Sequence, residues 1–208
     1  MRRVGVLLSG CGRYDGSEVQ ETVLVVLALR RRGLRPVFLA PDAEQRDVVD
    51  HTTGTVVESA PARQVLHEGA RLTRGVIRAL HEVSASELDA LVIPGGSGVL
   101  KNLCEPNGGL GAGALRGDVR RLLDGLRDRS VPVAAVGLGE IVLARHEDRP
   151  LSDLPMTMHA TGIVTDRQRR VLFTPGFVGT DEITEAAEGI ERLVGELAGW
   201  LAGSEVVE

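Results

Sequence analysis

Residues 131–140 constrain the fold of this chain more than any other stretch. Residues 131–136 are a short apolar run rich in β-branched side chains, which indicates a buried strand. Gly137 and Gly139 follow directly, and glycine adopts the backbone angles of a tight turn at little cost. Glu140 then begins a predicted helix, with its carboxylate in the first turn, where the helix dipole favours it. A strand, a sharp turn and a helix in this order present a nucleophile in many hydrolytic enzymes, but this turn has no Ser, Cys or Thr.

Strand-like and helix-like segments alternate along the rest of the chain. Predicted strands lie at residues 3–8, 35–39, 76–80, 90–93 and 131–136. Predicted helices lie at residues 17–32, 61–71, 118–129, from 140 onward and 180–201. Aromatic residues are only 2% of the chain, so the core must be aliphatic, and Val-rich strands suit a parallel sheet that is covered on both faces. The alternation predicts one α/β domain over residues 1–208, with a mainly parallel sheet and helices on both faces.

Four segments depart from this simple alternation. Residues 43–60 have no regular pattern, and residues 97–114 are a Gly-rich loop. Residues 156–159 have a strand-like pattern. Within residues 163–173, two apolar stretches flank a charged run, which predicts a hairpin at the edge of the sheet.

Composition and charge argue against several classes of protein. The net charge of −5 disfavours a surface that binds nucleic acid. Cys11 and Cys104 are too few for a disulfide framework and lack the spacing of a metal site. No stretch approaches the roughly 20 apolar residues that span a bilayer, and the apolar run at residues 3–8 predicts a first strand rather than a signal peptide. We therefore expect no nucleic-acid or membrane partner, no metal, no cofactor and a cytoplasmic location.

Three loops are predicted to meet at one edge of the sheet. Ligands of open parallel sheets bind beyond the carboxyl ends of the strands. Residues 9–17, 94–104 and 137–140 each follow a predicted strand at that edge. We therefore expect the functional site to be built from these loops.

The same loops carry a family resemblance. Residues 9–18 (SGCGRYDGSE) resemble the opening of the ElbB-like proteins, which belong to the ThiJ/PfpI superfamily and are related to class I glutamine amidotransferase domains. Residues 93–103 (IPGGSGVLKNL) resemble the second loop of that superfamily. Residues 65–75 (VLHEGARLTRG) also resemble ElbB-like sequences, so the resemblance extends over most of the chain.

The resemblance implies a fold and a site. It implies a flavodoxin-like three-layer sandwich that is commonly dimeric, so we expect a homodimer. It also implies a small pocket with a nucleophile-elbow cysteine and a nearby glutamate. The glutamate corresponds to Glu21 and the cysteine position to Gly137, while the amides of the oxyanion site correspond to Gly96 and Leu138. Because Gly137 has no thiol, this position cannot form the thiohemiacetal intermediate that the resemblance implies for cysteine-dependent relatives.

The sequence therefore predicts a cofactor-independent enzyme without cysteine chemistry at the elbow. We expect Glu21 to transfer protons on a small carbonyl- or carboxylate-bearing metabolite, because partial burial raises a carboxyl pKa toward useful values. An isomerase, hydratase or lyase reaction fits this chemistry. A helix N-terminal charge is the structural explanation for Glu21. The alternatives are a non-catalytic small-molecule-binding or chaperone-like protein, and a glyoxalase-like enzyme that uses Cys11.

Other polar residues are candidates for the same pocket. Cys11 is predicted near a helix N-terminus, where the pKa of a thiol can fall, and it can equally be a wall of the pocket. Tyr14 and Asp15 are candidates for substrate binding. Tyr14 can instead simply cover the pocket, and Asp15 can instead stabilise its own turn. His159 is a candidate proton carrier because histidine titrates near neutrality, and His146 is open to the same role.

Three more side chains have structural explanations that we favour. Glu140 fits helix N-terminal stabilisation, with a new carboxylate at the pocket rim as its functional alternative. Glu18 fits capping of the first helix. Cys104 lies in the Gly-rich loop and has no predicted role.

Overall fold

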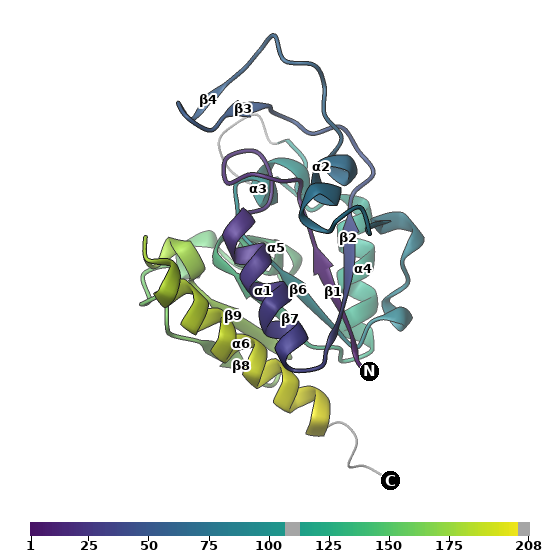
Figure 1. The fold of residues 1–208 in the computed structure, drawn as a ribbon. Coiled ribbons are helices and arrows are strands. Elements are labelled where there is room, and N and C mark those ends of the chain that lie inside the picture. Colours follow the sequence, from purple (N-terminus) through teal and green to yellow (C-terminus); the bar gives the residue numbers. More distant parts are fainter. Residues whose placement is uncertain (107–112, 204–208) are drawn as a thin grey trace.

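A seven-stranded sheet in the order β5-β2-β1-β6-β7-β9-β8 forms the centre of the protein (Figure 1). The structure is a computed structural model that describes residues 1–106 and 113–203. The strands are β1 (Arg3–Leu7), β2 (Arg35–Ala40), β5 (Arg78–Ala79), β6 (Ala90–Ile93), β7 (Val133–Val136), β8 (Val164–Asp166) and β9 (Val171–Thr174). Neighbouring strands are parallel except for the antiparallel pair β8 and β9. The predictions of a mainly parallel sheet and of an edge hairpin are confirmed.

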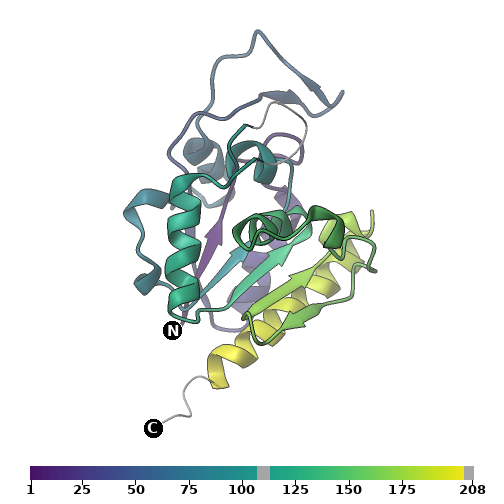
Figure 2. The same ribbon diagram turned by 180° about the vertical axis from the view of Figure 1, so that it is seen from behind.

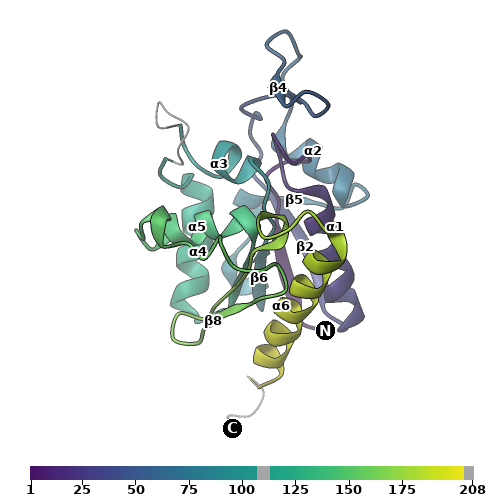
Figure 3. The same ribbon diagram turned by 90° about the vertical axis from the view of Figure 1, so that its left-hand side faces the viewer.

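Helices cover both faces of this sheet. One face carries α1 (Val19–Arg31), α2 (Val65–Leu72) and α6 (Ile183–Gly203), and the other carries α3 (Gly98–Asn102), α4 (Gly117–Asp128) and α5 (Glu140–His146). Figure 1 shows α1 and α6 in front of the sheet, and Figure 2 shows α4 and α5 from behind. Figure 3 shows the sheet edge-on between the two helical layers. The flavodoxin-like three-layer sandwich is therefore confirmed.

Strand β7 shows why the sequence forms two cores. Successive side chains of a strand point to opposite faces of the sheet. Ala134 and Val136 pack in the core beneath α1 and α6, whereas Val133 and Ala135 pack in the core beneath α4 and α5. A strand that is buried on both faces needs a continuous apolar run, and each fully buried aliphatic side chain of Val or Leu size contributes about 1.5–3 kcal/mol.

A small antiparallel sheet of β3 (Val49–Asp50) and β4 (Thr55–Val56) projects beyond the carboxyl ends of the main strands (Figure 1). Asp15 holds this excursion to the first loop, because its Oδ2 accepts a hydrogen bond of 2.9 Å from the Val49 amide. The short 3-10 helices are η1 (Leu80–Glu82), η2 (Ala85–Glu87), η3 (Gly137–Gly139), η4 (Leu151–Asp153) and η5 (Gly176–Val178). Within the described residues, no helix is both long and apolar enough to cross a membrane.

Two predicted helical or loop boundaries are wrong. The helix predicted at residues 61–71 begins only at Val65, because the backbone of Arg63 accepts a hydrogen bond from the Gln45 amide and is held in an extended conformation. The loop predicted at residues 97–114 begins with α3, and its residues 107–112 lie outside the described part of the chain.

Three further local predictions need correction. Residues 156–159 form turns rather than a strand, because β8 is the outer strand of the sheet and local bonds such as Met158 N–H to the Pro155 carbonyl satisfy the backbone. The strand predicted at residues 76–80 shortens to β5. The helix predicted at residues 17–32 begins only at Val19, after its N-cap Glu18, and the Ser17 hydroxyl accepts a hydrogen bond from the Ser9 amide.

Candidate functional site

A pocket of about 370 Å³ lies at the carboxyl ends of the strands. It is lined by Arg13, Tyr14, Glu18, Glu21, Gly96, Ser97, Leu138, Phe177 and Val178. These residues come from the three predicted loops, from the first turn of α1 and from η5, which follows β9. A parallel sheet brings such loops together because all of its strands end at the same edge.

Glu21 is placed in this pocket by the start of α1. The N-cap residue Glu18 accepts a hydrogen bond of 2.6 Å from the Glu21 amide to its Oε2, which satisfies one of the free N–H groups of the first turn. The capping role expected for Glu18 is therefore present. The same turn directs the Glu21 side chain toward the sheet, where only 2% of the residue is exposed.

Two backbone amides bind the Glu21 carboxylate, one on each oxygen. The Gly95 N–H donates to Oε2 at 2.8 Å, and the Phe177 N–H donates to Oε1 at 3.0 Å. Burial raises the pKa of Glu21 to about 7, although the Phe177 and Gly95 amides lower it, and the nearby Glu18 carboxylate raises it further. Desolvation therefore outweighs the two hydrogen bonds, and the carboxyl titrates close to neutral pH.

Three glycines surround this carboxyl group and leave it room. A Cβ atom at Gly95 would lie 2.7 Å from Glu21 Oε2, and one at Gly137 would lie 2.9 Å from Oε1. A Cβ at Gly176 would collide with Oε1 as well. Gly137 and Gly176 also have positive φ angles of 53° and 54°, which side-chain-bearing residues rarely adopt. Side chains are thus excluded around Glu21 on three sides.

The turn after β7 keeps the shape of a nucleophile elbow without a nucleophile. Gly137–Gly139 forms η3, and the left-handed Gly137 directs the chain past Glu21. Leu138 is the second residue of η3, and the first N–H groups of a helix have no acceptor within it. Leu138 lines the pocket, so its amide is the candidate donor to a ligand that the resemblance implied.

The first loop brings Arg13 and Tyr14 to the pocket, and the backbone carbonyl groups of both residues accept hydrogen bonds. The Ser97 amide donates to the Arg13 carbonyl at 2.8 Å, and Lys101 Nζ donates to the Tyr14 carbonyl at 2.8 Å. The Tyr14 ring also contacts the ring of His51, with centroids 5.2 Å apart. The two pocket side chains thus extend from a fixed backbone.

Asp15 and Cys11 belong to the same loop but do not line the pocket. Asp15 is 1% exposed and points to Val49 and to the imidazole of His51, whose Nε2 lies 3.7 Å from Oδ1. Cys11 is half-buried, and burial raises the pKa of its thiol, with a further rise from Glu68. The expectation of a lowered thiol pKa is therefore wrong, because desolvation and a carboxylate act on Cys11 rather than a helix N-terminus.

His159 and Glu140 also lie away from the pocket. The His159 side chain is 65% exposed on a turn, with Nδ1 3.1 Å from Thr161 Oγ1 and Nε2 3.7 Å from Glu185. Glu140 is buried and accepts a hydrogen bond of 2.7 Å from Arg149, and burial raises the pKa of its carboxyl. Across residues 1–106 and 113–203, no group of three or more His, Cys, Asp or Glu side chains is placed to hold a metal ion.

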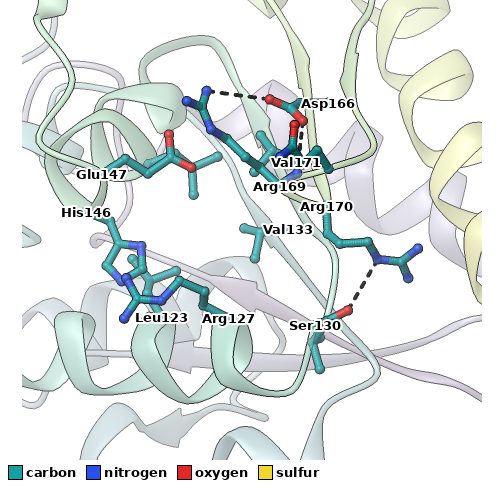
Figure 4. A pocket seen from close by; sticks show the side chains of 13 residues that line it. Leu123, Arg127, Ser130, Val133, His146, Glu147, Asp166, Arg169, Arg170 and Val171 are labelled. Carbon is teal, nitrogen blue, oxygen red and sulfur yellow. Dashed lines mark hydrogen bonds and ion pairs between the residues drawn. The ribbon is translucent and has the colours of Figure 1, made fainter.

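His146 lines a different cleft, shown in Figure 4. This cleft has a volume of about 530 Å³ and lies at the amino ends of β7 and β9, opposite the pocket of Glu21. The buried His146 imidazole contacts Asp124, with Nε2 2.9 Å from Oδ1. The structure thus places His146 too far along α5 to serve Glu21.

Four residues of the pocket were not among the sequence candidates. Arg13 and Ser97 lie inside the two loop motifs, and their position in those motifs was the available signal. Phe177 and Val178 follow β9, so the rule that sites form beyond the carboxyl ends of strands would have found them if the edge hairpin had been treated as part of the parallel sheet.

Comparison with known proteins gives relatives over most of the chain. No family model matches the sequence. The rat "ES1 protein homolog, mitochondrial" is 31% identical over 226 residues, which cover 92% of this chain and 81% of that protein. The human "Glutamine amidotransferase-like class 1 domain-containing protein 3, mitochondrial" is 46% identical over 101 residues, which cover 49% of this chain and 37% of that protein.

Solved structures agree on the fold. An isoprenoid biosynthesis protein with an amidotransferase-like domain from Ehrlichia chaffeensis superposes with a TM-score of 0.87 at 26% identity, over 97% of this chain and 100% of that one. A ThiJ/PfpI domain protein from Brachyspira murdochii has a TM-score of 0.57 at 12% identity, over 97% of this chain and 96% of that one, which supports the fold alone. The ElbB-like subgroup and the replacement of a cysteine at Gly137 stay predictions.

Proposed function

The chain belongs to the family of ES1 and glutamine amidotransferase-like class 1 domain proteins, and we propose that it is a cofactor-independent enzyme that moves a proton on a small carbonyl- or carboxylate-bearing metabolite. One observation carries the proposal: the carboxyl of Glu21 is buried, lines a pocket and has a pKa of about 7. A group that both removes and returns a proton works best when its pKa lies near the working pH.

The proposed step needs a base and a group that stabilises negative charge. Ionised Glu21 removes a proton from a carbon next to a carbonyl, and the electron pair of the broken C–H bond moves to the carbonyl oxygen, which forms an enolate. Leu138 lines the same pocket, and its N–H is the donor that we assign to this oxygen. Protonated Glu21 then returns the proton to a neighbouring atom, so the overall reaction is an isomerisation that needs no oxidant or reductant.

The missing side chain at Gly137 supports such a step. A Cβ at Gly137 would lie 2.9 Å from Glu21 Oε1 and 3.3 Å from the Pro175 carbonyl oxygen, so a side chain there would press against the carboxylate. In our proposal the reacting carbon of the substrate approaches this carboxylate from the pocket. Hydratase or lyase chemistry uses the same proton transfer, followed by addition of water or loss of a leaving group.

The test follows exchange of C–H for C–D. The protein is incubated in D2O with small 2-oxo acids and diketones, and NMR measures the loss of the proton next to the carbonyl. Glu21→Gln is expected to slow this exchange at least about 100-fold, the usual contribution of a general base. Glu188→Gln, an exposed glutamate on α6, is the matched control and should leave the rate unchanged. No exchange above the buffer rate with any compound would contradict the proposal.

A second measurement guards against misfolding of the variant. Both oxygens of Glu21 accept backbone hydrogen bonds, so the NH2 group of a glutamine leaves one amide without an acceptor. The second measurement is therefore made on the wild-type protein, as the pH dependence of its exchange rate. This rate should rise with pH and level off above about pH 7, as Glu21 ionises. A rate that does not depend on pH between 5 and 9 after correction for buffer would exclude Glu21 as the base.

A non-catalytic small-molecule-binding protein is the second candidate. The observation that favours it is the pair of amide bonds to Glu21, because the same bonds hold α1 to the loops after β6 and β9 without any chemistry. Binding of the test compounds without exchange would support this candidate. A chaperone-like role stays a prediction, and the glyoxalase-like alternative is weakened because Cys11 does not line the pocket.

We also propose a homodimer. Val19, Val23 and Leu27 recur at four-residue intervals on α1 and are 38%, 53% and 42% exposed, which is consistent with a face covered by a second copy. Sedimentation analysis of the purified protein tests this. The cytoplasmic location stays a prediction, and the rat and human relatives are named as mitochondrial proteins.

A further inference from the structure

We propose that Arg13 is the specificity-determining residue of the Glu21 pocket and that it selects substrates with a small anionic group, a carboxylate or a phosphate. This inference rests on the proposed function for the position of the reacting carbon. It goes further because it proposes that the substrate is negatively charged and that the charged group binds at the Arg13 end of the pocket.

The guanidinium of Arg13 has hydrogen-bond donors to spare. In residues 1–106 and 113–203, Arg13 forms no ion pair with a carboxylate, whereas Lys101 in the neighbouring loop is paired with Asp47 at 2.8 Å. The guanidinium carbon of Arg13 lies 5.4 Å from the centroid of the Tyr14 ring, over its face. An arginine carries five N–H donors, and a contact with an aromatic face uses none of them.

The loop holds Arg13 in position at the pocket. Its carbonyl is bound by the Ser97 amide at 2.8 Å, and the next carbonyl, of Tyr14, is bound by Lys101 at 2.8 Å. The Gly16 amide closes the same turn on the Gly12 carbonyl at 2.7 Å. Only the exposed side chain of Arg13 can therefore move, so a bound anion orders a few torsion angles rather than a loop.

The charges of the pocket explain why an anionic substrate needs this arginine. Glu18 and Glu21 both line the pocket, and each would repel a carboxylate or phosphate. The Glu18 carboxylate is already bound to the Glu21 amide, and both oxygens of Glu21 already accept backbone hydrogen bonds. Arg13 is the one cationic side chain among the lining residues, and a guanidinium binds an oxyanion with two parallel hydrogen bonds.

The geometry gives the substrate two ends. The anionic group binds Arg13 at the exposed side of the pocket, and the carbonyl group lies against Leu138 with its neighbouring carbon at Glu21. A volume of about 370 Å³ holds a molecule of this kind with a short carbon chain. The proposed class is therefore a small 2-oxo acid or a phosphorylated carbonyl compound.

The test compares a charged probe with a neutral one of similar shape. Pyruvate and pyruvamide have the same shape and differ in that a neutral carboxamide replaces the carboxylate, and NMR titration gives the dissociation constant of each. The wild-type protein should bind pyruvate at least about 10-fold more tightly than pyruvamide. Arg13→Gln should weaken pyruvate binding about 10-fold and change pyruvamide binding much less, and Arg13→Lys should fall between wild type and Arg13→Gln because it keeps the charge without the planar fork of donors.

Inorganic phosphate distinguishes the two sources of the anion. If phosphate competes for the Arg13-dependent site more tightly than pyruvate, the natural group is a phosphate, and the reverse order indicates a carboxylate. Arg13 is exposed, so its variants are expected to fold, and thermal unfolding checks this. Equal affinity of the wild type for pyruvate and pyruvamide, or an equal loss of both in Arg13→Gln, would overturn the proposal.

The same experiment separates this proposal from the proposed function. Arg13-dependent pyruvate binding without C–H exchange leaves the anion site standing and removes Glu21 as a base. Exchange that needs Glu21 but has no preference for anions supports Glu21 as the base and removes the anion site at Arg13. In Arg13→Gln the exchange rate of pyruvate should fall more than that of pyruvamide, whereas a merely destabilised protein would lose both rates equally.

Discussion

The pocket around Glu21 and the cleft around His146 differ in how their charged groups are satisfied. The cleft is the larger, about 530 Å³ against about 370 Å³. Its ionisable side chains have intramolecular partners. Figure 4 shows the pairs of Asp166 with Arg169 and of Arg170 with the Ser130 carbonyl. The other pairs are Arg127 with Asp124, His146 with Asp124, and Glu147 with Arg149. In the pocket, Glu21 titrates near neutrality and Arg13 has no ionic partner in the described residues. Volume and number of charges therefore indicate chemistry less well than a buried group with a shifted pKa.

The two regions also differ in their left-handed residues. In and around the pocket, Gly96, Gly137 and Gly176 have positive φ angles, and at each a Cβ would lie within 3 Å of a neighbouring atom. At the cleft the positive-φ residues are Ser130 and Arg170, which carry side chains. The pocket needs glycine because other atoms approach closely, whereas the open cleft tolerates side chains in a strained conformation.

The largest expected effect is the dependence of stability on Glu21 ionisation. The pKa of Glu21 is about 7 in the folded protein and 4.5 for a free glutamate, so the folded state keeps a proton that the unfolded state releases between these values. Stability therefore falls as pH rises through this window. Between pH 5 and pH 8 the free energy of unfolding should fall by about 2–3 kcal/mol relative to Glu21→Gln. Urea unfolding at several pH values measures this. If the free energy of unfolding depended on pH in the same way in both proteins, Glu21 would not differ from the paired groups of the cleft.

The next effect comes from the left-handed residues. Gly176→Ala places a Cβ against Glu21 and Val136 at a φ of 54° and should cost about 2 kcal/mol or more. Ser130→Gly in the cleft has a similar φ of 54° and should change stability by no more than about 1 kcal/mol, because relief of strain offsets the entropy of glycine. Thermal unfolding of both variants is the measurement. Similar losses of stability in the two variants would show that the close approach of neighbouring atoms is not the reason why the pocket has glycine at these positions.

The smallest effect is expected at His146. His146→Gln removes the contact with Asp124, which is 40% exposed and can be solvated instead, so the cost should be about 1 kcal/mol. Proton exchange on pyruvate should stay within about twofold of wild type, since the cleft lies at the opposite ends of the strands. A large loss of exchange without unfolding would mean that the cleft, rather than the pocket, carries the chemistry.

Patterns of apolar residues and glycines in the sequence were enough to predict the sandwich and the loops that form the pocket. Residues 131–136 indicated a strand buried on both faces, and the structure has β7 there. Glu21 and Leu138 were assigned through the family resemblance, and both line the pocket. These predictions hold because the burial of a strand and the glycine turn that follows it are encoded in neighbouring residues. A parallel sheet then brings the loops after its strands to one edge.

Only the tertiary structure decided which polar side chains enter the pocket. Cys11, Arg13 and Asp15 are neighbours on one loop, yet only Arg13 lines the pocket, while Asp15 is buried against Val49. No sequence pattern orients side chains on an irregular turn, because each is directed by partners far along the chain. The pKa of Glu21 has the same origin: segments more than seventy residues away provide the burial and the two amides that set it.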